Sequence, residues 1–179
     1  IFKKNPVFLI WEDRSAVFKD SLNIWGTNSE YGTLGGAVAV IHHDNNASAY
    51  VADGATISTK TLDVDANNRA VDIVVAGNGG KSETVSVDAA VSVIYTQNST
   101  NAYIGKATVT ASDDVNVDAL DENFTLNLGG TIVESGAAGI GATIAYNYLE
   151  RNTNAFINGN VNSGDSVSVN AKNTGEIIS

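Results

Sequence analysis

The chain has 179 residues, a length that suits one ordinary domain or part of a repeat array. It contains no Cys, which excludes a disulfide scaffold, a zinc ribbon, an iron–sulfur site and a thiol nucleophile. Its 20 Asp and Glu residues outnumber its 10 Lys and Arg residues, and the net charge of −10 argues against nucleic acid as a partner because phosphate binding needs clustered basic side chains.

The first 33 residues differ in composition from the rest. They hold six of the 13 aromatic residues, the only proline (Pro6) and four of the ten basic residues, and their net charge is zero. The apolar run at residues 7–11 is far shorter than the roughly 20 residues of a membrane span, so we expect neither a span nor a signal-peptide core. We predict that residues 1–33 form an N-terminal cap or an atypical first coil. A docking element for another part of a larger chain and an aromatic ligand site are the alternatives.

Residues 34–179 contain a repeat of 53 residues. The tripeptide at residues 49–51 (Ala-Tyr-Val) recurs at 102–104 and at 155–157, with a step of 53 each time. Three more segments recur in the same order, and their first copies are residues 37–41, 55–57 and 62–66. We therefore divide the region into copies at about residues 37–89, 90–142 and 143–179, of which the last is partial.

Each copy has the pattern of β-strands. In residues 62–66 the apolar side chains fall at every second position, as in a half-buried strand. Small residues in the repeats predict a narrow interior, and we expect these to point inward: Ala37, Ala39, Ala90, Ala142 and Ala145. Clusters of Asn, Asp, Gly and Ser predict turns, and they lie at residues 44–46, 67–68, 77–80, 97–99 and 152–154.

The period separates the all-β architectures. A propeller blade of about 40–50 residues would carry aromatic or Trp-Asp signatures, and a sandwich copy would need about 90–100 residues. A parallel β-helix fits if each 53-residue repeat holds three coils of about 18 residues, one for each strand-bearing stretch (residues 38–41, 57–64 and 71–75). We predict an all-β parallel β-helix, or β-solenoid, of about eight coils over residues 34–179, stacked into a rod of roughly 40 Å.

The repeats resemble those of very large secreted bacterial proteins. The clearest segments are residues 90–94, 101–105 and 114–119, in the order small-apolar strand, Ala-Tyr-Ile-Gly and Asp-Val-x-Val-x-Ala. This order is similar to leukotoxin-like and filamentous-haemagglutinin-like adhesins, the passengers of autotransporter or two-partner secretion. The resemblance covers residues 34–179 and implies a right-handed parallel β-helix, a place on the bacterial cell surface or outside the cell, and a stalk or contact role in virulence and cell adhesion. Because the chain has no Met, we expect a piece of a longer parent chain that supplies neighbouring coils.

Residues with metal or phosphate chemistry are few. His42 and His43 are adjacent at the end of a predicted strand, where neighbouring side chains point to opposite faces, so we expect a surface turn rather than a shared metal ion. The Gly clusters at 77–80 and 136–141 lack the Lys-Ser/Thr pair of a phosphate loop and predict turns. Triplets for N-glycosylation begin at residues 46, 98 and 123, and the Asn- and Ser-rich composition accounts for them.

Carboxylates and aromatic residues recur. Asp63 and Asp65 share one outward face, as do Asp114, Asn116 and Asp118, while Asp113 and Asp165 lie in turns. We expect a solvated acidic face, because copies three coils apart lie roughly 14 Å from each other; structural calcium is the alternative. Tyr50, Tyr103 and Phe156 predict a ladder with a core or corner role, and a carbohydrate-stacking platform is the alternative.

We predict a non-enzymatic extracellular segment, either the stalk or the contact surface of a large bacterial surface adhesin or secreted toxin. No residue is assigned a catalytic, cofactor-binding or metal-binding role, and no cofactor is expected. The partner is a host-cell surface protein or glycan. A self-assembling extracellular matrix or filament component is the first alternative, and a carbohydrate-active β-helix is the second.

Overall fold

The computed structural model describes residues 10–13, 24–29 and 32–179, and these form strands and turns without a helix. Two short strands come first, and three rounds of long strand, short strand and long strand follow. The strands are β1 (Ile10–Asp13), β2 (Ile24–Ser29), β3 (Thr33–Val51), β4 (Thr56–Thr59), β5 (Leu62–Ser82), β6 (Val85–Ile104), β7 (Thr108–Ala111), β8 (Val115–Ser135), β9 (Ala138–Ile157), β10 (Asn160–Ser163) and β11 (Val167–Ile178).

Equivalent strands of successive rounds pair in parallel, which makes the fold a parallel β-helix with three sheets. Sheet A has the order β1-β3-β6-β9, sheet B the order β11-β8-β5-β2, and sheet C the order β10-β7-β4. The register pairs Ala49 with Ala102 and Ala102 with Ala155, so the recurring segments of the sequence lie side by side. The prediction of an all-β parallel β-helix is confirmed.

The predicted coil length is wrong. Thr33 pairs with Ser86, 53 residues later, so one coil contains a whole repeat instead of a third of one. The stretches that we assigned to three coils belong to the sides of a single coil: residues 38–41 lie in β3, residues 57–64 lie in β4 and β5, and residues 71–75 lie in β5.

The polar clusters that we expected to turn the chain lie inside the long strands instead. Residues 44–46 belong to β3, and residues 77–80 belong to β5. A partly buried amide can bond there to its copy one coil away: Asn45 donates from Nδ2 to Oδ1 of Asn98 over 3.0 Å. The turns lie elsewhere, for example at Gly54, whose φ of +77° suits glycine.

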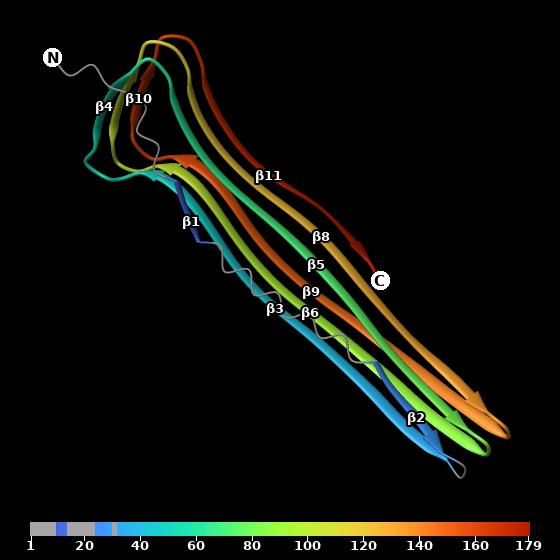
Figure 1. The fold of residues 1–179 in the computed structure, drawn as a ribbon. Helices are drawn as coiled ribbons and strands as arrows, with labels where there is room; N and C mark the ends of the chain where they lie inside the picture. The colour runs from blue at the N-terminus through green and yellow to red at the C-terminus, as the bar shows by residue number, and fades with distance from the viewer. Residues whose placement is uncertain (1–9, 14–23, 30–31) are drawn as a thin grey trace.

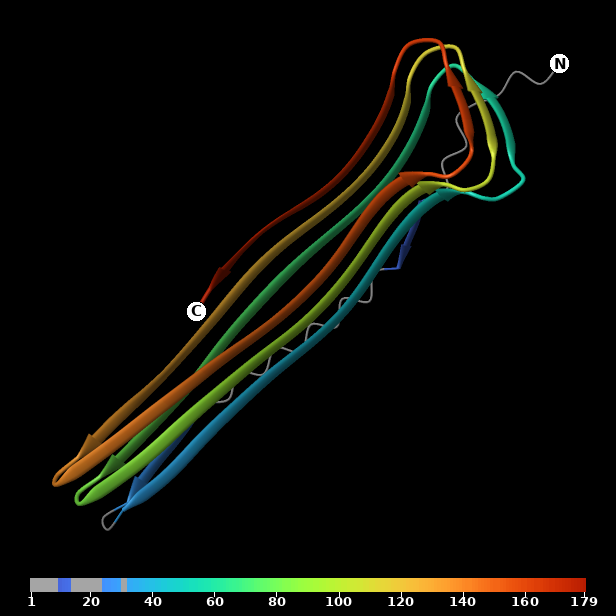
Figure 2. The same ribbon diagram turned by 180° about the vertical axis from the view of Figure 1, so that it is seen from behind.

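The coil is flat and elongated, as Figures 1 and 2 show. Sheets A and B pack face to face along its length. The short strands of sheet C close one end, and tight turns close the other. Strands of about 20 residues span about 65 Å, whereas three stacked coils rise only about 14 Å. The predicted rod of eight coils is therefore replaced by a unit that is much longer across its coils than along its axis.

The interior has an apolar end and a more polar middle. A cluster next to sheet C includes Val51, Leu62, Ile104, Val109 and Val117. Farther along, a smaller cluster of mostly small residues lies between sheets A and B: Ala37, Ala39, Ile41, Val74, Ala76, Ala90 and Ile94.

The expected inward positions are confirmed for Ala37, Ala39 and Ala90, which are buried. Ala142 was placed wrongly, because it pairs with the outward residue Ala89. Ala145 pairs with the buried Ser92, but it is exposed because only one neighbouring coil covers it.

Two described strands of the N-terminal region border the first coil. β1 runs antiparallel along residues 46–49 of β3, and β2 runs parallel along residues 77–82 of β5. The domain boundary after residue 33 stays a prediction, and the other residues of that region lie outside the described part of the chain.

Candidate functional site

The outer side of sheet A next to sheet C carries rows of polar side chains. We call it the polar face; it consists of the outward side chains within residues 44–50, 97–103 and 150–156. Asn154 donates to Asn101 over 2.9 Å, and Asn101 donates to Ser99 over 3.0 Å. Gln97 donates to Glu150 over 2.9 Å. The rows are held in place by one another, so the amides and hydroxyls form an ordered surface.

An aromatic ladder closes the polar face at the end of the strands. The ring of Tyr103 stacks on Tyr50 with centroids 5.2 Å apart and on Phe156 with centroids 5.0 Å apart. The predicted ladder is confirmed, but its members are one coil apart rather than three. The two outer rings are 40% and 45% exposed, so the ladder lies on the surface beside the corner. Because stacking occupies both faces of Tyr103, a sugar ring could stack only on the two outer rings.

The two histidines point to opposite faces, as expected. His42 faces outward and stacks on Tyr95, with centroids 5.1 Å apart. His43 is buried at 5% exposure, and its Nδ1 lies 2.5 Å from Oδ1 of Asp72. The predicted surface turn is wrong, because both residues lie within β3. The alternation that starts at Ala37 runs unbroken to this point and would have placed them correctly.

A band of buried polar side chains separates sheets A and B, and the sequence analysis did not assign it. Asp72 accepts a hydrogen bond from Thr96 over 2.7 Å, and Asp121 accepts one from Asn98 over 3.2 Å. Burial raises the pKa of Asp121, while the hydrogen bond from Asn98 and the charge of Arg151 act in the opposite direction.

Nearer the tight turns, Asp88 accepts hydrogen bonds from Asn78 over 3.0 Å and from Ser86 over 2.8 Å. The three buried carboxylates are at most 1% exposed, so none can reach a substrate in this fold. The amides of Asn98 and Asn123 are similarly enclosed, which removes two of the three glycosylation triplets from the surface.

The acidic side chains of sheet B lie much closer together than we expected. Asp65 pairs with Asp118 on the next coil, a spacing of about 4.8 Å instead of 14 Å. Burial raises the pKa of Asp65, and the charges of Asp118 and Asp63 raise it further. Asn116 donates to Asp63 over 2.8 Å, and Asn170 donates to Asp118 over 2.8 Å. Amides thus bind Asp63 and Asp118, whereas Asp65 and Asp118 are direct neighbours across the coils.

The other carboxylates named from the sequence lie near the turns. Asp113 and Asp165 precede β8 and β11, as predicted, and Asp113 lies 3.2 Å from the ammonium of Lys60. Asp114 accepts a hydrogen bond from the Ser166 hydroxyl over 2.6 Å. Within the described residues, no group of three or more His, Asp or Glu side chains is arranged to hold a metal ion.

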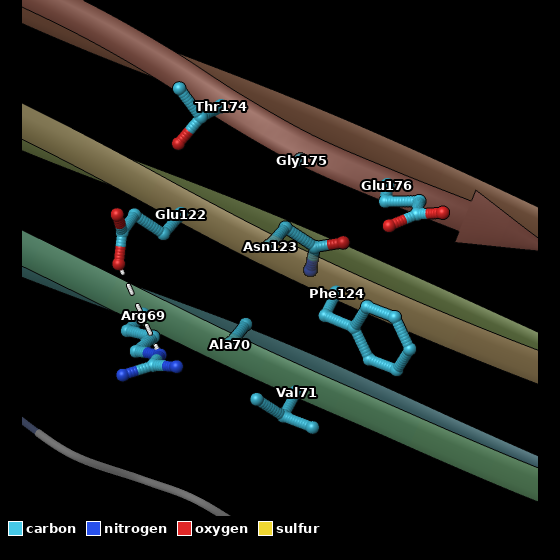
Figure 3. A pocket seen from close by; sticks show the side chains of 9 residues that line it. All are labelled: Arg69, Ala70, Val71, Glu122, Asn123, Phe124, Thr174, Gly175 and Glu176. Atoms are coloured by element: carbon cyan, nitrogen blue, oxygen red, sulfur yellow. Dashed lines mark ion pairs between the residues drawn. The ribbon is translucent and has the colours of Figure 1, made fainter.

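An open groove of about 390 Å³ lies on the outer side of sheet B, over β5, β8 and β11 (Figure 3). The ring of Phe124 and the side chain of Val71, which pair across the strands, form its apolar part. Arg69 and Glu122 lie beside them with Nε and Oε2 4.0 Å apart, and their side chains are 75% and 45% exposed. An exposed pair of this kind contributes at most about 1 kcal/mol. The groove offers apolar contact with a charged rim, which suits binding.

No family model matches the chain, and neither a curated protein nor a solved structure matches it. Within the part of the chain that the structure describes, no helix is long and apolar enough to cross a membrane.

Proposed function

We propose that this chain is a non-enzymatic contact segment of a large extracellular bacterial protein, an adhesin or a secreted toxin. The observation that carries the proposal is the continuous register of the coils, which sets three copies of each outward position side by side. Rows of amides, hydroxyls and aromatic rings on the polar face follow from it. Such rows suit the recognition of a host-cell surface protein or glycan, because they present short polar groups, mainly amides and hydroxyls, at a regular spacing of about 4.8 Å.

The dimensions favour a contact surface over a stalk. Each coil uses a whole repeat of 53 residues but adds only about 4.8 Å along the axis. The same residues create a face about 65 Å long on each side of the unit. Each added coil therefore adds much more lateral surface than length along the axis.

Two further observations support a role without catalysis. The carboxylates that are packed between the sheets are enclosed, with Asp72, Asp88 and Asp121 at most 1% exposed. On the outer face of sheet B, Asp63 and Asp118 accept hydrogen bonds from neighbouring amides. The extracellular location rests on the resemblance of the repeats and on the acidic, cysteine-free composition.

The test is binding of the labelled full chain to host cells and to a glycan array. Asn101→Lys places a long charged side chain in the middle of the polar face. Asn116→Lys is the matched control, because Asn116 also faces outward on the second coil and also hydrogen-bonds within its row. We expect saturable binding that Asn101→Lys abolishes and Asn116→Lys preserves. No binding by the folded chain, or turnover of an acidic polysaccharide, would contradict the proposal. Loss of binding in the presence of a calcium chelator would indicate that the acidic rows of sheet B bind a metal ion.

A self-assembling extracellular component is a second candidate, favoured by the edge of the last coil. Among the described strands, β9 pairs only with β6, so the backbone groups along its other edge can pair with a further strand, including one of another chain. End-to-end growth would raise the measured mass continuously with concentration. Asn152→Pro, which disrupts hydrogen bonding along β9, should stop that growth, and persistence of growth in this variant would exclude the β9 edge.

A further inference from the structure

The outer side of sheet A is apolar beyond the polar face. We call this region the apolar face; it consists of the outward side chains within residues 34–42, 87–95 and 140–148. No Asp, Glu, Lys or Arg occurs among its outward side chains: Leu34, Gly36, Val38, Val40, His42, Val87, Ala89, Val91, Val93, Tyr95, Ile140, Ala142, Ile144, Tyr146 and Tyr148. Leu34 is 82% exposed, and Ile140 and Ile144 are 60% and 61% exposed.

The inward positions of the same strands hold a mixture of small apolar side chains and hydrogen-bonded polar ones. Ser92 donates to Asn127 over 2.5 Å, and Asn127 donates to Asn147 over 2.7 Å. Thr33 and Ser86 share a hydrogen bond of 2.6 Å. A strand shifted by one residue would expose these bonded groups and bury the valines, so the hydrogen bonds oppose the shift. Apolar side chains therefore lie on both sides of these strands, and the larger share of the branched ones lies outside.

We propose that the apolar face is an interface at which a second copy of this chain packs, sheet against sheet. A flat, pleated face of branched side chains is complementary to another face of the same kind, and two such faces pack about 10 Å apart. A lipid bilayer is the less suitable occupant. The net charge of −10 and the acids of the row beside the apolar face, Asp44 and Glu150, disfavour contact with an anionic membrane surface. The proposal concerns a surface other than the polar face and does not depend on the contact role.

The charges set the orientation of the two copies. The row next to the apolar face contains Asp44, Gln97 and Glu150, and the chain carries a net charge of −10. Copies with parallel strands would place these acids opposite each other. A two-fold axis that lies in the interface and runs perpendicular to the strands packs apolar face on apolar face. The acidic rows of the two copies then lie at opposite ends of the interface. The row that contains Val91 is the middle row of the apolar face, so Val91 of each copy lies next to the axis.

The area indicates a weak dimer. A face about 27 Å long and about 14 Å wide covers roughly 400 Å², about half of what one partner contributes to a stable interface. It is nevertheless comparable to the largest apolar patch of a typical soluble monomer, about 300–600 Å², which is often functional. We expect reversible dimers with a dissociation constant in the micromolar to millimolar range.

The first test is the mass of the full chain in solution, by sedimentation and light scattering up to millimolar concentration. We expect a monomer that converts to a dimer and stops there. Val91→Asp should weaken dimerisation at least tenfold, and Val91→Ser should weaken it less. Ser99→Asp is the matched control on the polar face of the same strand and should leave the mass unchanged. A chain that stays monomeric, or a Val91→Asp chain that dimerises normally while folded, would overturn the proposal.

The second test uses the lack of native cysteine. Val91→Cys should form a disulfide between copies under mild oxidation, because the two-fold axis brings the equivalent positions together. Ser99→Cys should stay monomeric, because the axis moves the two polar faces apart. Equal cross-linking of both variants would refute the orientation, and growth through the β9 edge would cross-link neither. Flotation with phosphatidylcholine vesicles tests lipid as the occupant. If the wild-type chain stays monomeric and floats with the vesicles, and Val91→Asp does not float, the face binds lipid instead.

Discussion

The aromatic ladder offers the sharpest test of the coil length. Tyr103 stacks on two rings, at 5.2 and 5.0 Å, whereas Tyr50 and Phe156 each stack on one. A stacked aromatic pair contributes about 0.5–1.5 kcal/mol beyond the area that it buries. Loss of the stacking should therefore cost about 1–3 kcal/mol in Tyr103→Ala and about half of that in Tyr50→Ala or Phe156→Ala.

Double-mutant cycles separate the stacking from the other effects of truncation. Tyr50 and Tyr103 should show a coupling free energy of about 0.5–1.5 kcal/mol, and so should Tyr103 and Phe156. Tyr50 and Phe156 should show none, because the two centroid distances of 5.2 and 5.0 Å place them about 10 Å apart, with Tyr103 between them. Urea unfolding of the full chain, followed by far-ultraviolet circular dichroism, gives the free energies of unfolding.

A coil of about 18 residues would give a different result. Members of the ladder would then lie three coils, or roughly 14 Å, apart, and all three pairs would be additive. A coupling between Tyr50 and Tyr103 that is indistinguishable from zero, with both single variants folded, would refute the 53-residue coil. Tyr103→Leu is the control for bulk, since it keeps an apolar side chain at the position but removes the ring.

Three further variants test the packing between coils. Asp65→Asn should stabilise the fold by about 0.5–1 kcal/mol at neutral pH, because it removes repulsion between exposed carboxylates and adds an amide donor. Since the pKa of Asp65 is raised above 3.8, the folded state binds the proton more tightly than the unfolded state, and the wild-type chain regains stability as the pH falls toward 4. The stability advantage of Asp65→Asn, measured by urea titration, should therefore shrink at that pH. His43→Leu should destabilise the fold by about 3 kcal/mol or more, because it leaves Oδ1 of Asp72 buried without the imidazole, while Oδ2 keeps the hydrogen bond from Thr96. The double variant His43→Leu/Asp72→Ile, which carries the residues of the third coil, should recover most of the loss, and equal losses in the single and the double variant would contradict the facing geometry. Gly136→Ala should lower the thermal midpoint more than Gly130→Ala, because a Cβ at Gly136 meets the backbone of the preceding turn and one at Gly130 meets nothing; a larger effect of Gly130→Ala would contradict the stacking of the turns.

The repeat made the parallel register predictable. Residues 49–51 and 62–66 recur at a nearly constant step, and a β-helix places equivalent residues of successive coils side by side. The alternation of side chains also placed Ala37 and Ala39 inside and put His42 and His43 on opposite faces. These predictions depend only on the periodicity of the strand, which is local and strong.

The coil length was not predictable from local preferences. Asn and Asp favour turns because their side chains compete with the backbone for hydrogen bonds. In this fold the side chain of Asn45 is instead bound by Asn98 on the next coil, 53 residues away. The buried roles of Asp72 and Asp121 escaped prediction for the same reason, because their partners, Thr96 and Asn98, come from the opposite sheet. Neither partnership leaves a signal in the neighbouring sequence.

The same partnership explains how the molecule keeps an apolar face in solution. In most soluble sheets a polar side chain that points inward is costly because it loses water. In a stacked coil its copy or its opposite neighbour can supply the missing hydrogen bond, as Asn127 does for Ser92. The hydrophobic pattern then no longer has to point inward, and valines such as Val91 can lie outside where another sheet can reach them. Part of the apolar surface of the coil thus lies outside the core, where it can bind another sheet. Of the two tests, the cross-link at Val91→Cys examines this outward apolar surface most directly.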